Sequence, residues 1–554
     1  MILGLDVGGT HTDAVLIDEN GIAAQSKILT GEDLIETLRT SVADIISGTK
    51  PELLKRMVFS TTMATNAIVQ DRLEQTGMIV SAGPGMNPEW FSVGPSFHVI
   101  EGCLDHQGLE ALPINKKSVL NTGDIIRGKG IEVMGAVGKF SVRNPVHENQ
   151  IAEWLGPHFK HIALGHHMSG ALNFPRRITT TYLNAALFSI HSRFSQSLIS
   201  ILDEKGLNAP RYLLKPDGGT AGLGLARAFP AQTAQSGPAA SVMGALAMDG
   251  CAGTTLVLDV GGTTTDMAVV LDGAPLITPS GIKLGPFLTL IRSLNTYSIA
   301  IGGDSEVRID NNELKIGPLR KGMPMSFGGN VPTPTDAMVA LGILEAGSRN
   351  NAADAMEKVG GPMGWDVPAT ARNILEKMAS VIADSAREFI HEINSRPVYT
   401  IHEVLEDRKI EPESVVIIGG PAPQIAPFVG RALGVPHRVP PCFGVVNALG
   451  AAVARVTSEI TLQADTERGT VVIPEAGIQN RIDQAFNIDS AITLGREALK
   501  AMASETGADA DKIEISVTEQ QVFNMIRGYS RTGRNIRLKM CIKPGIIPEW
   551  KRKN

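Results

Sequence analysis

Two segments that lie far apart in the chain share one pattern of apolar and polar positions. Residues 3–17 read LGLDVGGTHTDAVLI, and residues 256–270 read LVLDVGGTTTDMAVV. In each segment a short apolar run leads into Asp-Val-Gly-Gly-Thr-x-Thr-Asp, and a second apolar run follows. Apolar runs on both sides of a Gly-Gly pair are typical of two buried strands joined by a tight turn. The separation is too long for a solenoid repeat, so the sequence predicts two similar domains that each open with this hairpin.

Strand-like and helix-like stretches alternate along the rest of the chain, which is typical of α/β layers. Short apolar runs at residues 78–80, 161–164 and 415–418 predict buried strands. Residues 371–393 have apolar positions at helical spacing and predict a long amphipathic helix.

Two stretches rich in small residues, 239–247 and 445–457, predict helices that pack closely against a neighbour. From about residue 460 the texture of the sequence changes. There we predict an added C-terminal module of unknown role, with a helix over 491–504 and a strand over 512–517.

The composition excludes several classes of protein. Of 554 residues, 43% are hydrophobic and 19% are charged, which is too apolar for a disordered chain. A net charge of −6 argues against a nucleic-acid-binding surface. No apolar run approaches the ~18 residues of a membrane helix, and the first residues lack a basic leader. The four cysteines are scattered without metal-binding spacing, so we expect a cytoplasmic protein with reduced thiols.

The Asp-Val-Gly-Gly-Thr motif has the features of a phosphate-binding turn. Two glycines remove side chains from the turn, so that backbone N–H groups can approach an anion, and the threonine adds a hydroxyl donor. The aspartate at the strand end, Asp6 or Asp259, can hold a Mg²⁺ ion that bridges phosphates. One such turn would mean little, but two matched copies point to a shared phosphate site.

Segments around the hairpins resemble a known family. Paired hairpins, a small-residue helix before the second one, a late Ile-Gly-Gly-Pro and a second small-residue helix are similar to the actin-like ATPase fold of sugar kinases and the heat-shock ATPase. Within that fold, the chain resembles the hydantoinase A/5-oxoprolinase family from residue 1 to about 455. The segments that carry this resemblance are STTMATNAIV at 60–69, TYLNA at 181–185, SGPAAS at 236–241, GGNVPTPTDA at 328–337, IIGGP at 417–421 and PPCFGVVNALG at 440–450.

The resemblance implies an α/β fold with two actin-like ATPase (ribonuclease H-like) domains around a nucleotide cleft, plus a small α+β C-terminal module. The first domain would comprise residues 1–245, with residues 440–458 returning to it. The second domain would comprise residues 246–439, and the module residues 460–554.

The resemblance also implies roles for individual residues. The phosphates would be contacted by the two turns, through Gly8, Gly9, Thr10 and Thr12 and through Gly261, Gly262, Thr263 and Thr265. Adenosine would lie against the backbone of Gly419 and Gly420.

The aspartates of the motif would carry the chemistry. Asp6 and Asp259 would organise Mg²⁺ or the attacking water. Asp13 and Asp266 would either take part in catalysis or only cap the second strand of each hairpin. Four further residues would lie near the cleft on the substrate side, namely Thr61, Thr62, Asn66 and Asp336.

Members of this family use ATP to cleave cyclic amides such as hydantoins or 5-oxoproline. The resemblance therefore implies ATP and Mg²⁺ as cofactors, a small cyclic amide as substrate, and a second subunit or a homo-oligomer. ATP would phosphorylate the amide carbonyl oxygen, and water would then open the activated amide. Three alternatives share the fold: the ATP-binding subunit of a ketone carboxylase, a small-molecule kinase, and a non-catalytic ATP-driven regulator.

Some features leave the substrate and the histidines open. The stretch 167–179 is shorter than in relatives, and the module after residue 460 does not resemble their C-terminal domain. His11 stands where the family more often has an aromatic residue. The remaining candidate histidines are either metal ligands or ordinary core and surface residues, and these are His106, His161, His166 and His167.

Overall fold

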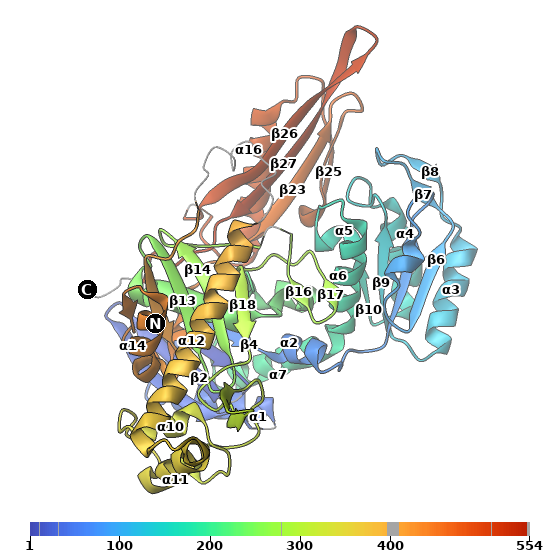
Figure 1. The fold of residues 1–554 in the computed structure, drawn as a ribbon. Helices are drawn as coiled ribbons and strands as arrows, with labels where there is room; N and C mark the ends of the chain where they lie inside the picture. The colour runs from blue at the N-terminus through green and yellow to red at the C-terminus, as the bar shows by residue number, and fades with distance from the viewer. Residues whose placement is uncertain (10, 32, 279, 396–408, 511, 551–554) are drawn as a thin grey trace.

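The computed structural model describes residues 1–554 apart from Thr10, Glu32, Pro279, residues 396–408, Asp511 and residues 551–554 (Figure 1). Four sheets of four or more strands organise the described residues. Two of these sheets contain the repeated hairpins, and the other two lie in residues 76–164 and 459–542.

The first hairpin lies in a six-stranded sheet with the strand order β12-β11-β4-β1-β2-β3. Strands β1, β2 and β3 form an antiparallel meander, and β4 and β11 run parallel to β1. Helices cover both faces, which explains why β1 and β4 are almost wholly buried. The strands are β1 (Ile2–Val7), β2 (His11–Asp18), β3 (Gly21–Leu29), β4 (Arg56–Thr61), β11 (Arg211–Leu214) and β12 (Thr220–Gly222), and the helices on one face are α1 (Leu34–Ile45) and α7 (Phe188–Glu204).

The second hairpin lies in a sheet with the same central arrangement. Its order is β15-β14-β13-β21-β22, with β18 also paired to β14, and β21 runs parallel to β13 as β4 does to β1. This repeated topology confirms the predicted α/β fold of two similar halves. The elements are β13 (Thr254–Val260), β14 (Thr265–Leu271), β15 (Ala274–Pro275), β18 (Thr296–Ile299), β21 (Ser414–Ile418), β22 (His437–Arg438), α10 (Pro334–Ala340), α11 (Arg349–Gly360), α12 (Val367–Asn394) and α14 (Ala422–Leu433).

Two helices of small residues, α9 (Ser236–Asp249) and α15 (Val446–Val453), lie between these two sheets and cross in direct backbone contact. A Cβ atom on Gly450 would lie 2.0 Å from the Ala240 carbonyl oxygen, and one on Gly244 would lie 2.1 Å from the Val446 carbonyl oxygen. Helix α15 also packs on β1, where a Cβ on Gly4 would meet the Ala448 carbonyl oxygen at 2.2 Å. The absence of side chains is therefore a requirement at this crossing.

A separate four-stranded parallel sheet lies beside the first half, with the order β10-β9-β5-β6. The apolar runs at 78–80 and 161–164 predict two of its strands, but nothing in those runs distinguishes this sheet from the one that contains β1. The elements of this layer are β5 (Thr76–Ser81), β6 (Ser96–Ile100), β9 (Val133–Gly138), β10 (His161–Leu164), α2 (Met63–Val69), α3 (Lys116–Gly128), α4 (Val146–Leu155), α5 (Gly165–Met168) and α6 (Phe174–Ala186).

Residues 459–542 form an antiparallel sheet with the order β25-β24-β23-β27-β26, covered on one face by α16 (Ile488–Glu505). Strands β26 (Ile515–Arg527) and β27 (Ser530–Ile542) form an arm that extends beyond the other strands at the top of Figure 1. The remaining strands are β23 (Glu459–Asp465), β24 (Thr470–Ile473) and β25 (Ile478–Arg481). Domain boundaries within the chain stay a prediction.

Short elements complete the fold. A helix, α8 (Leu223–Ala228), follows β12. In the described part of the chain, three strand pairs lie outside the larger sheets, namely β7 (Cys103–Leu104) with β8 (Glu110–Leu112), β16 (Lys283–Leu284) with β17 (Phe287–Leu288), and β19 (Val307–Asp310) with β20 (Glu313–Ile316). Among the described residues, no helix combines the length and the hydropathy that crossing a bilayer requires.

Candidate functional site

A cleft of about 580 Å³ lies between the turns of the two repeated hairpins. Gly8 and Gly9 line it from the first turn, and Gly261, Gly262 and Thr263 line it from the second. The two motifs, which are far apart in sequence, therefore face one cavity. Thr10 lies outside the described residues.

Each turn is closed by an equivalent backbone hydrogen bond. The Gly8 N–H donates to the His11 carbonyl at 3.0 Å, and the Gly261 N–H donates to the Thr264 carbonyl at 2.9 Å. A loop after β18 braces the second turn, because the Asp304 N–H donates to the Gly262 carbonyl at 2.7 Å. Both turns thus present backbone without side chains to the cleft, as phosphate binding requires.

Gly419 and Gly420, which follow β21, also line the cleft. The φ of Gly419 is +95°, and a Cβ there would lie 2.2 Å from the Val260 carbonyl oxygen and 2.7 Å from Asp259 Oδ1. A side chain at this position would therefore be strained and would displace the second hairpin.

Asp6 and Asp259 lie at corresponding positions of β1 and β13, and both line the cleft. Asp259 Oδ2 accepts hydrogen bonds from Ser241 Oγ at 2.5 Å and from Asn447 Nδ2 at 3.5 Å. Burial raises the pKa of both carboxyl groups. The neighbouring carboxylates Asp13 and Asp259 also act on Asp6, and together with burial they bring its pKa to about 6.

These two carboxylates have the chemistry of a divalent cation site. Asp6 Oδ1 is buried and has no hydrogen-bond partner among the described residues. An unpartnered carboxylate oxygen beside like charges is stabilised when a cation binds. Carboxylate oxygens are the protein ligands that Mg²⁺ prefers, so Asp6 and Asp259 could hold this ion.

The second aspartate of each motif has a different environment. Asp13 lines the cleft, and its Oδ1 accepts a hydrogen bond from Lys27 Nζ at 2.8 Å; Lys27 Nζ also donates to the Gly444 carbonyl at 2.9 Å. Asp266 lies opposite Asp259 in the β13–β14 pair and is not among the residues that line the cleft. Burial, with Asp259 nearby, raises the Asp266 pKa to about 6. The structure thus brings Asp13 but not Asp266 to the cavity.

The second threonine of each motif points into the protein. Thr12 is fully buried and shares a hydrogen bond with Thr30, and Thr265 is fully buried and donates to the Ile301 carbonyl at 2.7 Å. Neither lines the cleft. Their hydroxyl groups form hydrogen bonds within the protein, and a phosphate contact by these two residues stays a prediction.

The four residues expected on the substrate side do not line the cleft either. Thr62 Oγ1 donates to the Val7 carbonyl and accepts from Asn66 Nδ2, and Thr61 is buried with its Oγ1 accepting from the Met63 N–H. Asp336 is fully buried, and its carboxylate accepts from the Thr333 N–H in the capping box of α10 and from the Ser326 N–H of a preceding segment. These bonds stabilise the start of α10, and a substrate contact by any of the four residues stays a prediction.

Part of the cleft lining is apolar, which the sequence did not reveal. Phe327, Met338, Leu344 and Phe443 line it together with Gln424, whose Oε1 is buried without a partner among the described residues. These residues come from separate segments, so no local pattern links them. An apolar surface with one free amide oxygen has the chemistry to hold a purine base.

The candidate histidines do not gather around a metal site. His166 Nδ1 lies 2.5 Å from Glu148 Oε2, and His161 stacks on Phe188 with ring centroids 4.0 Å apart. Burial lowers the pKa of His161 and of His167 to about 4. Within the described part of the chain, no group of three or more His, Cys, Asp or Glu side chains has metal-binding geometry.

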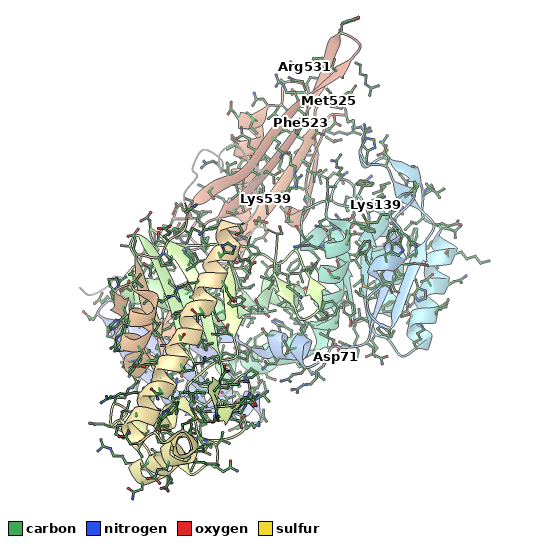
Figure 2. The ribbon with its side chains drawn as sticks, in the orientation of Figure 1. Asp71, Lys139, Phe523, Met525, Arg531 and Lys539 are labelled. Atoms are coloured by element: carbon green, nitrogen blue, oxygen red, sulfur yellow. The ribbon has the colours of Figure 1, made fainter. Side chains whose placement is uncertain are left out.

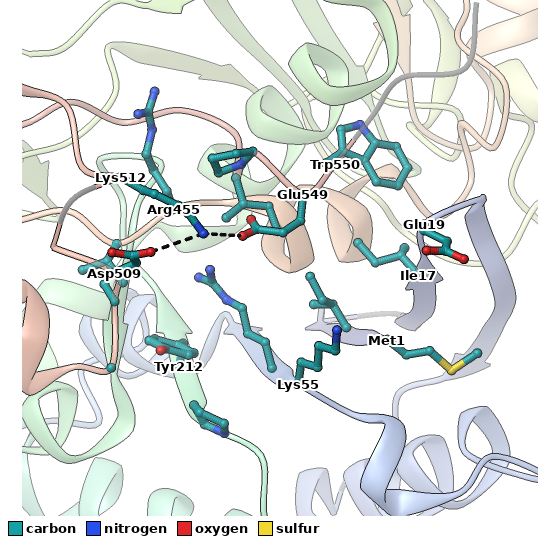
Figure 3. Close-up of a pocket in the computed structure, with 18 of the residues that line it drawn as sticks. Met1, Ile17, Glu19, Lys55, Tyr212, Arg455, Asp509, Lys512, Glu549 and Trp550 are labelled. Atoms are coloured by element: carbon teal, nitrogen blue, oxygen red, sulfur yellow. Dashed lines mark ion pairs between the residues drawn. The ribbon is translucent and has the colours of Figure 1, made fainter.

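Figure 3 shows a second cavity, of about 540 Å³, between the N-terminal strand and the C-terminal module. Lys512 forms ion pairs there with Asp509 at 3.2 Å and with Glu549 at 3.7 Å. None of the residues singled out from the sequence lines this cavity. The cleft between the hairpins is therefore the candidate active site.

The raised pKa of Asp6 gives a prediction for stability. Its native pKa of about 6 lies above the ordinary value of 3.8, so ionisation of Asp6 lowers the free energy of unfolding. This loss begins as the pH rises above about 4 and is complete above about 6. Asp6→Asn should therefore raise the free energy of unfolding at pH 8 on the order of 2 kcal/mol, and by much less near pH 4. Denaturant titrations at several pH values measure this, with Asp354→Asn as a control at an exposed site. An equal gain at every pH would contradict the assignment.

Comparison with known proteins identifies the family. The protein-family model described as "Hydantoinase/oxoprolinase N-terminal region" matches residues 2–158. The family model described as "Hydantoinase/oxoprolinase" matches residues 177–460. The chain belongs to the hydantoinase/oxoprolinase family. This confirms the resemblance found in the sequence.

Relatives of this hydantoinase/oxoprolinase chain are distant. An uncharacterised protein of Methanocaldococcus jannaschii is 23% identical over 82% of this chain and 72% of its own length. Caprolactamase subunit alpha of Pseudomonas jessenii is 24% identical over 75% of this chain, which spans 64% of that relative.

Two solved structures share the fold of this family member. The structure of the ATP-dependent caprolactamase from Pseudomonas jessenii aligns with a TM-score of 0.72 at 18% identity, over 98% of this chain and 87% of that chain. Nucleotide-free acetone carboxylase aligns with a TM-score of 0.70 at 17% identity, over 100% of this chain and 88% of that one. At these identities the likeness shows the fold alone.

Proposed function

We propose that this protein uses ATP to hydrolyse a cyclic amide, by phosphorylating the amide carbonyl oxygen. The observation that carries the proposal is the cleft itself, where two bare Gly-Gly turns face each other beside Asp6 and Asp259. The apolar side chains that line the cleft, Phe327 and Phe443 among them, add a surface for adenine. Family membership and the caprolactamase relative support this reaction class.

The residues of the cleft would divide the work as follows. The backbone of both turns and the Lys27 ammonium group would bind and orient the phosphates. Asp6 and Asp259 would hold Mg²⁺, which when bound would neutralise phosphate charge. The Asp13 carboxylate would keep Lys27 in place through their 2.8 Å ion pair. Gly419 and Gly420 would let the nucleoside lie against the backbone.

The reaction would proceed in three steps. The amide carbonyl oxygen would attack the γ-phosphorus of ATP and release ADP. The product would be an imidate phosphate, in which the phosphoryl group is bound to the former carbonyl oxygen of the ring. Water would then add to the carbon that bears this oxygen, and the carbon–nitrogen bond would break with a proton passing to nitrogen, leaving an acyl phosphate. A second water would add to the acyl carbon and displace inorganic phosphate, leaving a carboxylate. Phosphorylation removes the resonance that protects an amide from water, which is why ATP is needed.

Calorimetric titration with ATP tests the nucleotide site, and phosphate release tests the reaction. We expect ATP to bind when Mg²⁺ is present and to bind far more weakly with a chelator. Phosphate release should then rise when caprolactam, hydantoin or 5-oxoproline is added. Binding without amide-stimulated release by any member of a broad lactam panel would contradict the hydrolase proposal and leave the nucleotide site intact.

A second candidate, an ATP-binding subunit of a ketone carboxylase, is supported by the fold match to acetone carboxylase, which is as extensive as that to caprolactamase. The substrate that stimulates phosphate release distinguishes the two candidate functions. A carboxylase would release phosphate with a ketone and bicarbonate together, and not with a lactam. The caprolactamase relative is itself named a subunit, so each assay should also be run with the product of any neighbouring gene.

A further inference from the structure

Strand β26 is a long, uncovered sheet edge. Among the residues that the structure describes, it pairs with β27 on one side only, and none of its thirteen residues is buried. Several of its large apolar side chains lie in solvent, with Phe523 59% exposed and Ile526 67% exposed. Figure 2 shows Phe523 and Met525 on this projecting arm. Proteins normally cover or blunt such an edge, because it offers free backbone groups and apolar surface to another strand.

Alternate residues of β26 form one row on the face of the sheet that α16 does not cover. Val522 and Gln520 lie opposite the buried Ile536 and Leu538, on the side that packs against α16. The other row reads Glu519, Gln521, Phe523, Met525 and Arg527.

This row is complementary to itself when two copies run antiparallel. With Phe523 at the centre, Glu519 lies opposite the partner's Arg527, and Gln521 lies opposite the partner's Met525. If the two-fold axis lay at Gln521 or at Met525 instead, Phe523 would lie opposite a charged residue. The other charged residue of the row would then have no partner of opposite charge. One register alone joins both opposite charges and both phenylalanines.

We propose that this protein forms a two-fold dimer through β26, with the axis at Phe523. The pairing joins two five-stranded sheets into one continuous sheet and removes the free edge of each copy. Two Glu519–Arg527 pairs flank two stacked Phe523 rings on the axis. Within one copy, Glu519 lies 3.6 Å from Arg537, and Arg527 lies 2.8 Å from Glu467, so each charge already has a neighbour that orients it.

Light scattering during size-exclusion chromatography tests the dimer and its register. The native chain should have a mass near twice its 58.8 kDa. Glu519→Arg or Arg527→Glu alone places like charges opposite each other twice, and should raise the dimer dissociation constant about tenfold or more. The double variant restores opposite charges and should return the dissociation constant toward the native value. It keeps both within-chain defects, so only pairing between copies explains its recovery.

Cysteine cross-linking tests the position of the axis. Under mild oxidation Phe523→Cys should form a disulfide between copies, because residue 523 lies opposite itself. Gln521→Cys is the matched control on the same row. In the proposed register the two 521 positions lie four residues apart along the strand, roughly 13 Å, which is too far for a disulfide. The native chain, with its own four cysteines, sets the baseline.

Several results would overturn the proposal. A monomer at every concentration would remove the dimer, and a dimer that both charge variants leave unchanged would place the interface elsewhere. Failure of the double variant to recover, or equal cross-linking at positions 521 and 523, would overturn the register. A native thermal midpoint for each variant shows that a lost dimer is not lost folding. None of these measurements depends on the proposed hydrolase activity.

Discussion

Replacing Asp259 with asparagine should lower ATP-dependent phosphate release by about a hundredfold to a thousandfold, the range typical for loss of one electrostatic group from an active site. Asparagine keeps the size of the side chain and can still accept from Ser241, which now lies 2.5 Å from Asp259 Oδ2. It cannot supply the negative charge that holds a divalent cation. The loss should therefore appear in kcat, and ATP binding should lose its dependence on Mg²⁺.

The proposed mechanism requires the same defect from the other half of the cleft. Asp6→Asn, at the equivalent position of β1, should reduce phosphate release to a similar extent. Asp354→Asn, on the exposed surface of α11, should leave it unchanged. If Asp259→Asn kept native turnover while Asp6→Asn lost it, one hairpin would suffice and the two-hairpin mechanism would be wrong.

Gly450→Ala should produce a large loss of stability from a single added carbon. The new Cβ would lie 2.0 Å from the Ala240 carbonyl oxygen and 2.5 Å from the Gly244 nitrogen, so two backbones must separate. We expect a loss of about 3 kcal/mol, even though alanine favours a helix over glycine by about 1 kcal/mol. Calorimetry should show the thermal midpoint falling by several degrees.

A matched glycine shows whether the crossing is the cause. Gly128 ends α3, and a Cβ there has nothing within 4 Å. Gly128→Ala should therefore leave the thermal midpoint close to native. Equal effects at both positions would mean that the backbone contact between α9 and α15 does not limit stability.

The features that could be predicted from the sequence are those with a local signal. The two hairpins repeat one pattern of apolar runs around Gly-Gly, and the structure contains them as β1–β2 and β13–β14. The predicted helix at 371–393 matches α12, because its apolar spacing reflects one buried face. The predicted strand at 415–418 matches β21, because its continuous apolar run reflects burial on both faces. The small-residue stretch at 445–457 predicted a close crossing, although α15 ends earlier, at Val453.

Strand alternation explains one difference between the expected and observed sites. His11 and Asp13 line the cleft, and Thr12 between them points to the opposite face, because successive side chains of a strand alternate. The family resemblance placed Thr12 at the phosphates. The period of two could have shown that Thr12 and Asp13 do not share a surface.

Other parts of the site depend on contacts between distant segments. Lys27 comes from β3, and Phe443 from the loop before α15, yet both line the cleft. No spacing along the chain links such residues. Strand β26 was predicted only over 512–517 because most of its length is exposed on both faces, so its apolar residues follow no burial pattern.

The position of α15 also bears on how the protein is made. Val15 and Ile17 of the first sheet pack against Ala448 and Leu449, which the ribosome adds more than four hundred residues later. Until then, α9 packs on this face against β4 and β11, but Val15 and Ile17 lack most of their partners, although domains usually fold in the order of synthesis. The first half of the chain must therefore wait, partly folded, for the last helix of its own core. During that interval the nascent protein is a natural client for chaperones.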